Sequence, residues 1–283
     1  KKTKMNLLNE IVQAKKQLKG VVIETPLVEN TNLSEEFSAT ILLKREDLHI
    51  VRSYKIRGAY HKISSLTEAE TKQGIVCASA GNHAQGVAFS CNLLQIKGKI
   101  YMPKTTPKQK IKQVQLFGKS FVEIELIGDT FDDAYAKAVE DAKENNKIFI
   151  HPFDDLKVIA GQATVGLEIL ESFHSPIDYV FVPIGGGGLA AGLSTVFEEL
   201  SPNTKIIGVE PEGAPTMKTA IATGKNTPLE TIDKFVDGAA VKQVGNLTFE
   251  ICQRLLDDII LVTEGKVCTT ILRLYNDEAM VVE

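Results

Sequence analysis

Residues 179–200 read YVFVPIGGGGLAAGLSTVFEEL. An apolar run typical of a buried strand ends at Ile184, glycines follow, and helical spacing of apolar residues begins at Leu189. A strand, a tight turn and a helix in this order form part of a parallel βαβ unit. Residues without side chains also let backbone N–H groups approach an anion, and the helix dipole favours negative charge there. The sequence therefore predicts that a phosphate binds at the run Gly185, Gly186, Gly187 and Gly188.

Strand-like and helix-like stretches alternate on both sides of this run. The predicted strands are residues 41–44, 74–77, 99–102, 121–126, 148–151, 179–184, 205–209 and 259–262. The predicted helices are residues 82–94, 108–117, 131–145, 158–172 and 189–200. Several strands are continuous apolar runs, as parallel strands covered on both faces should be. The pattern predicts an α/β fold of open, mostly parallel twisted sheets with helices on both faces.

We expect this fold to form two lobes. The larger lobe would combine residues 1–52 and 153–283 and bind a cofactor, and the smaller would hold residues 53–152 and bind substrate. In open α/β sheets, ligands bind beyond the carboxyl ends of the strands. The chain stops within an apolar run at Glu283, so we also expect further residues in the natural protein.

Composition excludes several classes of function. Hydrophobic residues make up 43% of the 283 residues and charged residues 24%, and the net charge is −4, so no basic footprint indicates nucleic acid. We find no membrane-length apolar run and no secretory signal, which favours a cytoplasmic protein. The cysteines form no C-x-x-C pair, and we expect Cys77 and Cys268 to be small core residues. The histidines show no spacing typical of zinc sites, so we predict no metal.

A second motif, SAGNHAQG at residues 79–86, also lies at a strand end and a helix start. Small and polar residues at a helix N-terminus form a cradle for a carboxylate. Asn82 could equally be a simple N-cap, which is the commoner role of such a residue. His83 alone is weak evidence of chemistry, since most single histidines are neither catalytic nor bound to metal.

A third motif, SYKIRGA at residues 53–59, contains Lys55. A lysine can form a Schiff base with an aldehyde cofactor if its surroundings favour the neutral amine. An isolated lysine would rarely have this role, and the flanking pattern is what singles it out.

In this order, the segments KREDL at 44–48, SYKIRGA, SAGNH and the glycine run resemble the fold-type II enzymes that depend on pyridoxal 5'-phosphate (PLP). The resemblance covers nearly the whole chain and implies a fold similar to the tryptophan synthase β subunit. The segments FVDGAAV at 235–241 and VVE at 281–283 resemble threonine dehydratases in particular.

The resemblance implies a role for each matching residue. Lys55 would hold the cofactor and act as the base at the substrate Cα, and Tyr54 would lie against the cofactor ring, where the family usually has phenylalanine. Asn82 would bond the ring hydroxyl, and Gly238 would line the ring edge. The glycine run would bind the phosphate, and Glu283 would begin another segment lining the pocket. The substrate carboxylate would be held by Ser79, Ala80, Gly81, Asn82 and His83.

The implied reaction is the dehydration and deamination of L-threonine, and of L-serine, by a lyase of isoleucine biosynthesis that forms a homodimer or homotetramer. Ala80 stands where similar serine racemases carry a second serine, which favours elimination over racemisation. Thr216 stands where the racemases place an aspartate on a divalent cation, which leaves at most a weak cation site at Glu210.

Five alternatives stay open. Serine racemases, β-replacement enzymes and threonine synthases belong to the same PLP family. A binding module could keep the pocket without turnover. A dinucleotide-binding oxidoreductase would explain Gly186, Gly188, Ala191 and Glu210, but it leaves Lys55 without a role.

Overall fold

The computed structural model describes residues 2–283, and the chain divides into two compact units. Unit 1 comprises Lys1–Glu10, His151–Ala163 and Pro176–Glu283, and unit 2 comprises Ile11–Ile150 and Thr164–Ser175. The expected lobes divide the chain differently, because they place residues 11–52 and 164–175 in the larger lobe. Their roles in binding cofactor and substrate stay predictions.

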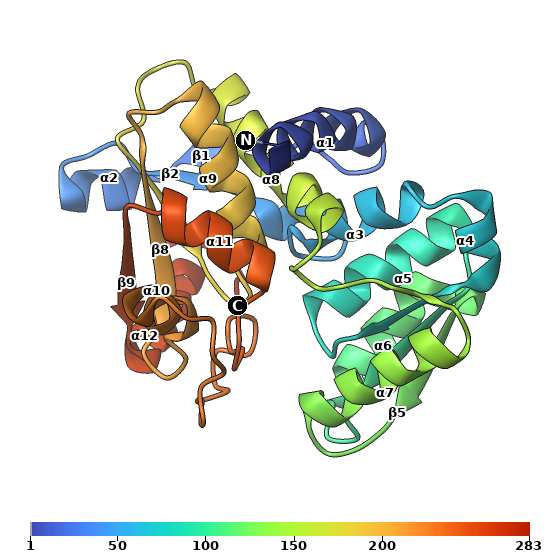
Figure 1. Ribbon diagram of the computed structural model, residues 1–283. Coiled ribbons are helices and arrows are strands. Elements are labelled where there is room, and N and C mark those ends of the chain that lie inside the picture. The colour runs from blue at the N-terminus through green and yellow to red at the C-terminus, as the bar shows by residue number, and fades with distance from the viewer. Residues whose placement is uncertain (1) are drawn as a thin grey trace. The chain divides into compact units, whose positions relative to one another are not determined.

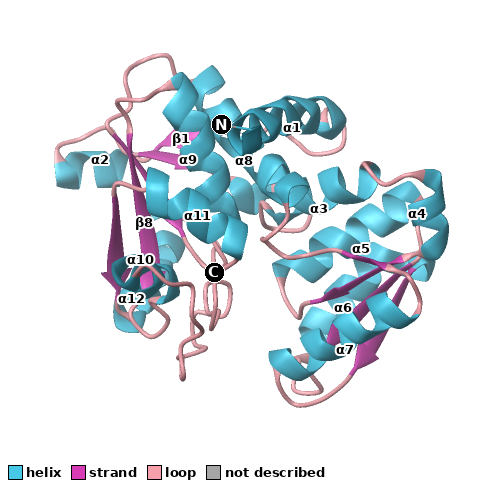
Figure 2. Cartoon of the chain, viewed as in Figure 1, coloured by secondary structure: helices cyan, strands magenta, loops and turns pink. Residues whose placement is uncertain are grey.

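Unit 2 is built around a parallel sheet with strand order β5-β4-β3-β6. Its strands are β3 (Ile75–Ala78), β4 (Gly98–Met102), β5 (Val122–Leu126) and β6 (Ile148–Phe149). Its helices include α3 (Lys55–Ser64), α4 (Glu68–Gln73), α5 (Asn82–Leu94), α6 (Lys108–Gly118) and α7 (Phe131–Glu144). Figures 1 and 2 show α5, α6 and α7 lying along the strands of this sheet.

The core of this unit follows from the alternation of side chains along β3. Ile75 and Cys77 point to one face and pack with the buried side chains of α3, α5 and α6. Val76 and Ala78 point to the other face and pack against Ala134 and Ala138 of α7. Because both faces are covered, all of β3 is apolar and buried, as predicted from its continuous apolar run.

Unit 1 contains a second parallel sheet, with strand order β7-β8-β9. Its strands are β7 (Tyr179–Pro183), β8 (Lys205–Pro211) and β9 (Asp258–Val262). Its helices include α9 (Gly188–Leu200), α10 (Thr216–Thr223), α11 (Asn246–Leu255) and α12 (Glu264–Glu278). The prediction that apolar runs mark doubly covered strands is wrong for β7, where Phe181 is 62% exposed.

The remaining elements are short or span the unit boundaries in sequence. Strands β1 (Leu27–Glu29) and β2 (Leu42–Lys44) form an antiparallel ribbon, which the predicted parallel pattern did not include. Helix α2 (Thr31–Phe37) and the 3₁₀ helices η1 (Glu46–Leu48) and η2 (Lys119–Phe121) are single turns or little more. The long helices α1 (Lys2–Leu18) and α8 (Leu156–Ser172) complete the fold. Within residues 2–283, no helix has the length and apolarity required to span a membrane.

Candidate active site

Lys55 is the first residue of α3, and Tyr54 is the N-cap of that helix. The Lys55 amine lies 5.5 Å from the centre of the Tyr54 ring. Burial disfavours its charged form and lowers the pKa of Lys55 to about 8. Relative to an ordinary lysine with a pKa of 10.5, this shift increases the fraction of neutral amine at pH 7. Lys55 is therefore suited to act as a nucleophile or a base near neutral pH.

Helix α5 packs closely on the first turn of α3 because of Gly86. A Cβ added at Gly86 would lie 3.1 Å from the Lys55 carbonyl oxygen and from the Ile56 nitrogen. That approach is too tight for a larger residue, so Gly86 helps to set the position of the backbone that carries Lys55. Gly86 belongs to the motif SAGNHAQG, but this role is not apparent from the sequence alone.

Arg57, two residues after Lys55, is fully buried in unit 2. Its guanidinium donates to Glu46 at 2.8 and 2.9 Å, to Glu168 at 2.5 and 2.8 Å, and to the Thr164 hydroxyl at 3.1 Å. These contacts use all five N–H donors of the side chain. Lys44 also donates to Glu168, at 2.6 Å. The first turn of α3 is therefore fixed by a buried charge cluster, which the sequence did not signal.

Because this cluster contains Glu46, the free energy of unfolding should depend on pH in the acidic range. Burial alone would raise the pKa of Glu46, but hydrogen bonds from His49 and Arg57 prevail and lower it to about 2. The carboxylate thus stabilises the fold fully above its ordinary pKa of 4.5, and this contribution disappears as the pH falls toward 2. Glutamine does not titrate, so in Glu46→Gln we expect the free energy of unfolding to decrease less steeply as the pH falls through this range. Urea unfolding at several pH values measures this dependence. Glu68→Gln on the surface of α4 should keep the parent's slope, and an unchanged slope in Glu46→Gln would contradict the assignment.

The turn after β3 carries the predicted carboxylate cradle. Its Ser79 hydroxyl accepts hydrogen bonds from the amides of Gly81, at 3.2 Å, and Ala84, at 3.3 Å. Gly81 is the N-cap of α5 and Asn82 is its first helical residue, so the alternative reading of Asn82 as an N-cap is wrong. The first amides of the helix, at Asn82 and His83, face the helix N-terminus, where an anion binds favourably.

The His83 ring is directed into the protein. It is 3% exposed, and its Nε2 lies 2.9 Å from the carbonyl oxygen of Ile150. A carbonyl oxygen only accepts, so Nε2 carries the proton in this bond. The ring therefore anchors the turn, and the contribution of His83 to an anion site would come from its backbone amide.

The glycine run in unit 1 connects β7 to α9 as predicted. A Cβ added at Gly186 would lie 2.1 Å from the Phe153 ring, and one at Gly188 would lie 3.1 Å from the Phe153 Cβ. Gly187 has a φ of +94° and its carbonyl accepts the Ala191 amide at 2.8 Å, which starts the helix. Glycine is thus required here by close packing and by the left-handed backbone, and the turn presents amides at a helix N-terminus.

Gly238 lies beside this run. A Cβ added at Gly185 would lie 3.2 Å from the Gly238 carbonyl oxygen and 3.1 Å from the Ala239 Cα. Glu283 follows α12 and is exposed. The roles of both residues stay predictions.

Glu210 lies near the end of β8 and is buried. The residue is 1% exposed, and its carboxylate accepts the amides of Met217 and Lys218 at 2.8 and 2.9 Å. Burial raises the pKa of Glu210 to about 7 despite these bonds. Because the carboxylate is engaged with the start of α10, it is poorly placed to bind the ribose of a dinucleotide.

The cysteines behave mostly as apolar side chains. Cys77 is fully buried as predicted, but Cys268 on α12 is partly exposed, so the prediction of a core position is wrong there. Burial raises the pKa of the Cys77 thiol, which makes it unreactive.

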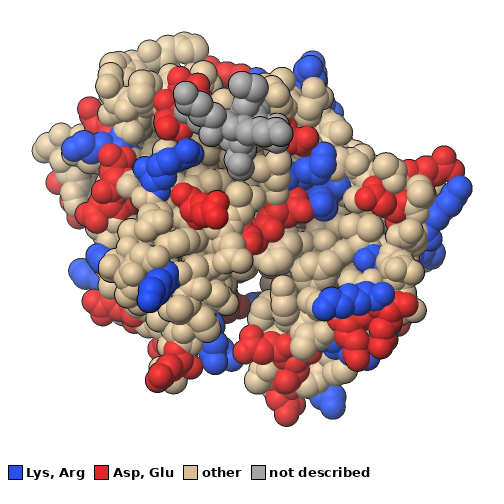
Figure 3. Space-filling view, in the orientation of Figure 1, with Lys and Arg blue, Asp and Glu red and all other residues tan. Residues whose placement is uncertain are grey.

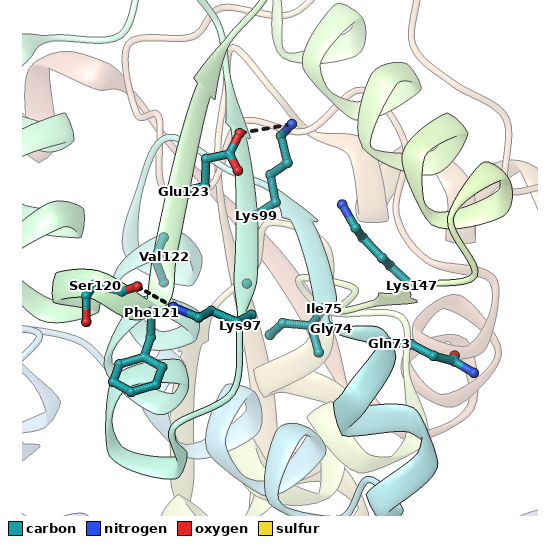
Figure 4. Close-up of a pocket in the computed structure, with 11 residues that line it drawn as sticks. Gln73, Gly74, Ile75, Lys97, Lys99, Ser120, Phe121, Val122, Glu123 and Lys147 are labelled. Atoms are coloured by element: carbon teal, nitrogen blue, oxygen red, sulfur yellow. Dashed lines mark hydrogen bonds and ion pairs between the residues drawn. The ribbon is translucent and has the colours of Figure 1, made fainter.

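A hollow of about 370 Å³ lies at the end of the unit 2 sheet where its strands begin (Figure 4). The turn after β3 is at the other end of the strands. Three lysines line it, and each has a partner. Lys97 donates to the Ser120 carbonyl at 2.8 Å, Lys99 pairs with Glu125 at 2.6 Å, and Lys147 pairs with Asp141 at 2.9 Å. Acidic and basic side chains are also interspersed on the face shown in Figure 3. The hollow therefore offers paired charges and none of the predicted site residues.

Comparison with known proteins identifies the family. The family model described as "Pyridoxal-phosphate dependent enzyme" matches residues 18–283. The chain is 57% identical over 276 residues to the L-threonine dehydratase biosynthetic IlvA of Halalkalibacterium halodurans, covering 98% of this chain and 66% of that protein. The chain thus spans slightly less than two thirds of the length of this curated relative.

Solved structures give the same result. The processed form of threonine deaminase isoform 2 from Solanum lycopersicum is 41% identical, with a TM-score of 0.93 over 98% of this chain and 80% of that one. Maize serine racemase is 29% identical, with a TM-score of 0.92 over 97% of this chain and 82% of that one. Both agree with the α/β fold predicted from the sequence. The chain therefore belongs to the pyridoxal-phosphate dependent enzyme family, with the fold-type II architecture.

Proposed function

We propose that this protein is a PLP-dependent ammonia-lyase that converts L-threonine to 2-oxobutanoate and ammonia, and L-serine to pyruvate and ammonia. The observation that carries the proposal is the position of Lys55 as the first residue of α3, a helix whose first turn is fixed by the buried Arg57 ion pairs, and the lowered pKa of Lys55 supports it. The 57% identity to a biosynthetic L-threonine dehydratase supports threonine as the substrate and a role in making isoleucine.

Each unit, taken by itself, carries residues of the kind that PLP requires. The glycine run offers amides at the start of α9, where a Cβ would collide with Phe153, and such a turn suits a phosphate. In unit 2, the resemblance implies that Lys55, the first residue of α3, would bond to the aldehyde, with Tyr54 against the ring and Asn82 at its hydroxyl. When bound, PLP supplies an electron-withdrawing ring that accepts charge from the substrate Cα.

The protein's part in the reaction is then to hold the substrate and to move protons. The amides at the start of α5 and the Ser79 turn would bind the substrate carboxylate and so orient the Cα–H bond. The Lys55 amine would remove the Cα proton, and the β-hydroxyl would take up one proton and leave as water, so that the proton removed and the proton delivered balance. Hydrolysis of the released product takes one water back, so threonine gives 2-oxobutanoate and ammonia with atoms in balance.

A second candidate is serine racemisation, which the similarity to maize serine racemase favours. Racemisation requires a second acid on the face opposite the lysine. Ala80 lies in the turn after β3, and its methyl side chain cannot donate a proton. Elimination is therefore the better supported reaction.

The proposal is tested by incubating the protein with PLP and each of L-threonine, L-serine and D-serine. We expect ammonia and a 2-oxo acid in equal amounts from both L-amino acids, with threonine the better substrate by kcat/KM. Interconversion of L- and D-serine without ammonia would move the assignment to a racemase. Binding of PLP without turnover of any amino acid would indicate that the protein is a binding module and not an enzyme.

The glycine run gives a prediction about cofactor affinity. Gly186→Ala places a Cβ 2.1 Å from the Phe153 ring, so either the ring or the loop must move. We expect PLP binding to weaken by at least about tenfold, since misplaced amides lose charge-assisted hydrogen bonds. Fluorescence titration with PLP measures this. Gly265→Ala on α12, where an added Cβ has no atom within 4 Å, is the matched control, and equal affinities in the two variants would refute the cradle.

We also propose that the protein acts in the cytoplasm on a small amino acid and assembles as a homodimer or homotetramer. Acidic and basic side chains are interspersed on the face shown in Figure 3, and the net charge is −4. Neither feature is typical of a surface that binds nucleic acid, which supports a small-molecule partner. Light scattering of the purified protein tests the oligomeric state, and a mass of one chain would contradict it.

A further inference from the structure

The first turn of α11 contacts the glycine run through Thr248. This side chain is fully buried, and its hydroxyl lies 2.6 Å from the carbonyl oxygen of Gly186 and 3.2 Å from that of Gly245. A hydroxyl has one hydrogen to donate. The shorter contact takes it, so Thr248 bonds the loop rather than its own helix. The Gly245 amide also approaches the Gly186 carbonyl, at 3.4 Å.

Holding this carbonyl fixes the next amide. In a planar trans peptide, the C=O of one residue and the N–H of the next point to opposite sides. With the Gly186 carbonyl directed to Thr248, the Gly187 N–H must point away from α11. Gly187 has a φ of +94° and directly precedes the helical residues of α9. A left-handed residue next to a right-handed one directs successive amides into one anion-binding concavity.

Thr248 is itself held in place by Asp154. The Asp154 carboxylate accepts the amides of Asn246 at 2.9 Å, Leu247 at 2.9 Å and Thr248 at 3.2 Å, which caps α11. The Asp154 amide in turn donates to the Nδ1 of His151 at 2.8 Å. The hydroxyl thus sits on a rigid helix start, which is what a group that orients a loop requires.

The glycine run is enclosed on both sides by these elements. An added Cβ at Gly187 would lie 3.0 Å from the Thr248 hydroxyl oxygen, whereas one at Gly186 would meet the Phe153 ring. Phe153 directly precedes Asp154, so one short segment supplies both the ring on one side and the cap of α11 on the other. The loop has little freedom to turn its peptides in any other way.

We propose that Thr248 is a positioning residue for the cofactor phosphate, which acts by fixing the Gly186–Gly187 peptide so that the Gly187 amide donates to the phosphate. This inference rests on the proposed function. Thr248 need not contact the phosphate, because it acts by fixing the orientation of the Gly186–Gly187 peptide.

The test compares PLP with pyridoxal, which lacks the phosphate. Thr248→Val removes the hydroxyl at nearly constant volume, and Thr248→Ser keeps it. We expect Thr248→Val to raise the Kd for PLP by about tenfold, which corresponds to about 1.4 kcal/mol, and to change the Kd for pyridoxal by less than about twofold. Thr248→Ser should bind PLP as the parent does. Equal weakening of PLP and pyridoxal in Thr248→Val, or failure of the serine variant to restore PLP binding, would overturn the proposal.

A second measurement uses inorganic phosphate on protein labelled with ¹⁵N-glycine. In the parent, the Gly187 amide resonance should shift on titration with phosphate, and in Thr248→Val this shift should be strongly reduced. If Thr248→Val does not fold, the parent spectrum still decides, because a Gly187 amide that ignores phosphate overturns the proposal.

The two measurements also separate this inference from the proposed function. If the parent shows the Gly187 shift with phosphate and Thr248→Val loses it, but the parent does not bind PLP, the function is contradicted and the positioning of the Gly187 amide by Thr248 is kept. A parent that binds PLP and turns over threonine, with Thr248→Val unchanged in its preference for PLP over pyridoxal, would keep the function and reject the positioning role.

Discussion

Replacing Lys55 by alanine is expected to lower turnover of threonine by at least about a thousandfold, since the variant lacks both the nucleophile and the base. No other residue described at the start of α3 can take this role, because Arg57 is buried and saturated with acceptors and Tyr54 has its pKa raised to about 12 by burial and by Glu46. Ammonia release measures the loss, and the near-ultraviolet and visible spectrum with PLP should lose the band of the lysine-bound cofactor.

The matched control is Lys62→Ala, which removes a partly exposed lysine from the same helix. It should keep the parent's turnover and spectrum. Far-ultraviolet circular dichroism of both variants should match the parent, because the Lys55 side chain carries little of the core. Turnover by Lys55→Ala at the parent rate would show that Lys55 is not the reactive lysine.

The second large effect concerns Arg57, whose replacement by methionine should destabilise the protein by about 3–5 kcal/mol. Methionine fills a similar space but leaves the Glu46 and Glu168 carboxylates buried without their cation, and such uncompensated charges are costly. Urea unfolding measures the change.

Lys72→Met provides the comparison, since Lys72 pairs with Glu68 at the surface at 2.7 Å with both side chains more than 70% exposed. Surface pairs contribute about 0–1 kcal/mol, so this variant should unfold close to the parent. If Arg57→Met lost no more stability than Lys72→Met, the buried cluster would not hold the first turn of α3.

Much of the fold could be predicted from local pattern. Helix α5 was predicted over the residues it occupies, 82–94, because small and apolar residues repeat there between a strand end and a polar stop. Strands β3, β4 and β5 were found within a residue or so of their observed bounds. The exposed face of β7 could not be predicted, since an apolar run does not reveal whether anything covers it.

The candidate site was predictable only where function leaves a local signature. Lys55 and the glycine run could be found because their neighbours form recognisable motifs. No local pattern indicates the carboxylate partners of Arg57, the capping of α11 by Asp154 or the role of Thr248. Those roles come from contacts such as Arg57–Glu168 and Thr248–Gly186, whose partners lie far apart in the chain. Glu210 shows the same limit, because only the structure reveals that its carboxylate caps α10.

The most direct test of the central claim is to reduce the PLP-loaded protein with borohydride, digest it and locate the modified peptide by mass spectrometry. The reduction makes the bond between the cofactor and its lysine permanent. We predict that the cofactor is found on Lys55, in the segment SYKIRGA at 53–59, and at no other lysine in comparable yield. A modification concentrated on another lysine, or none in a folded protein saturated with PLP, would contradict the assignment of Lys55 and with it the proposed mechanism.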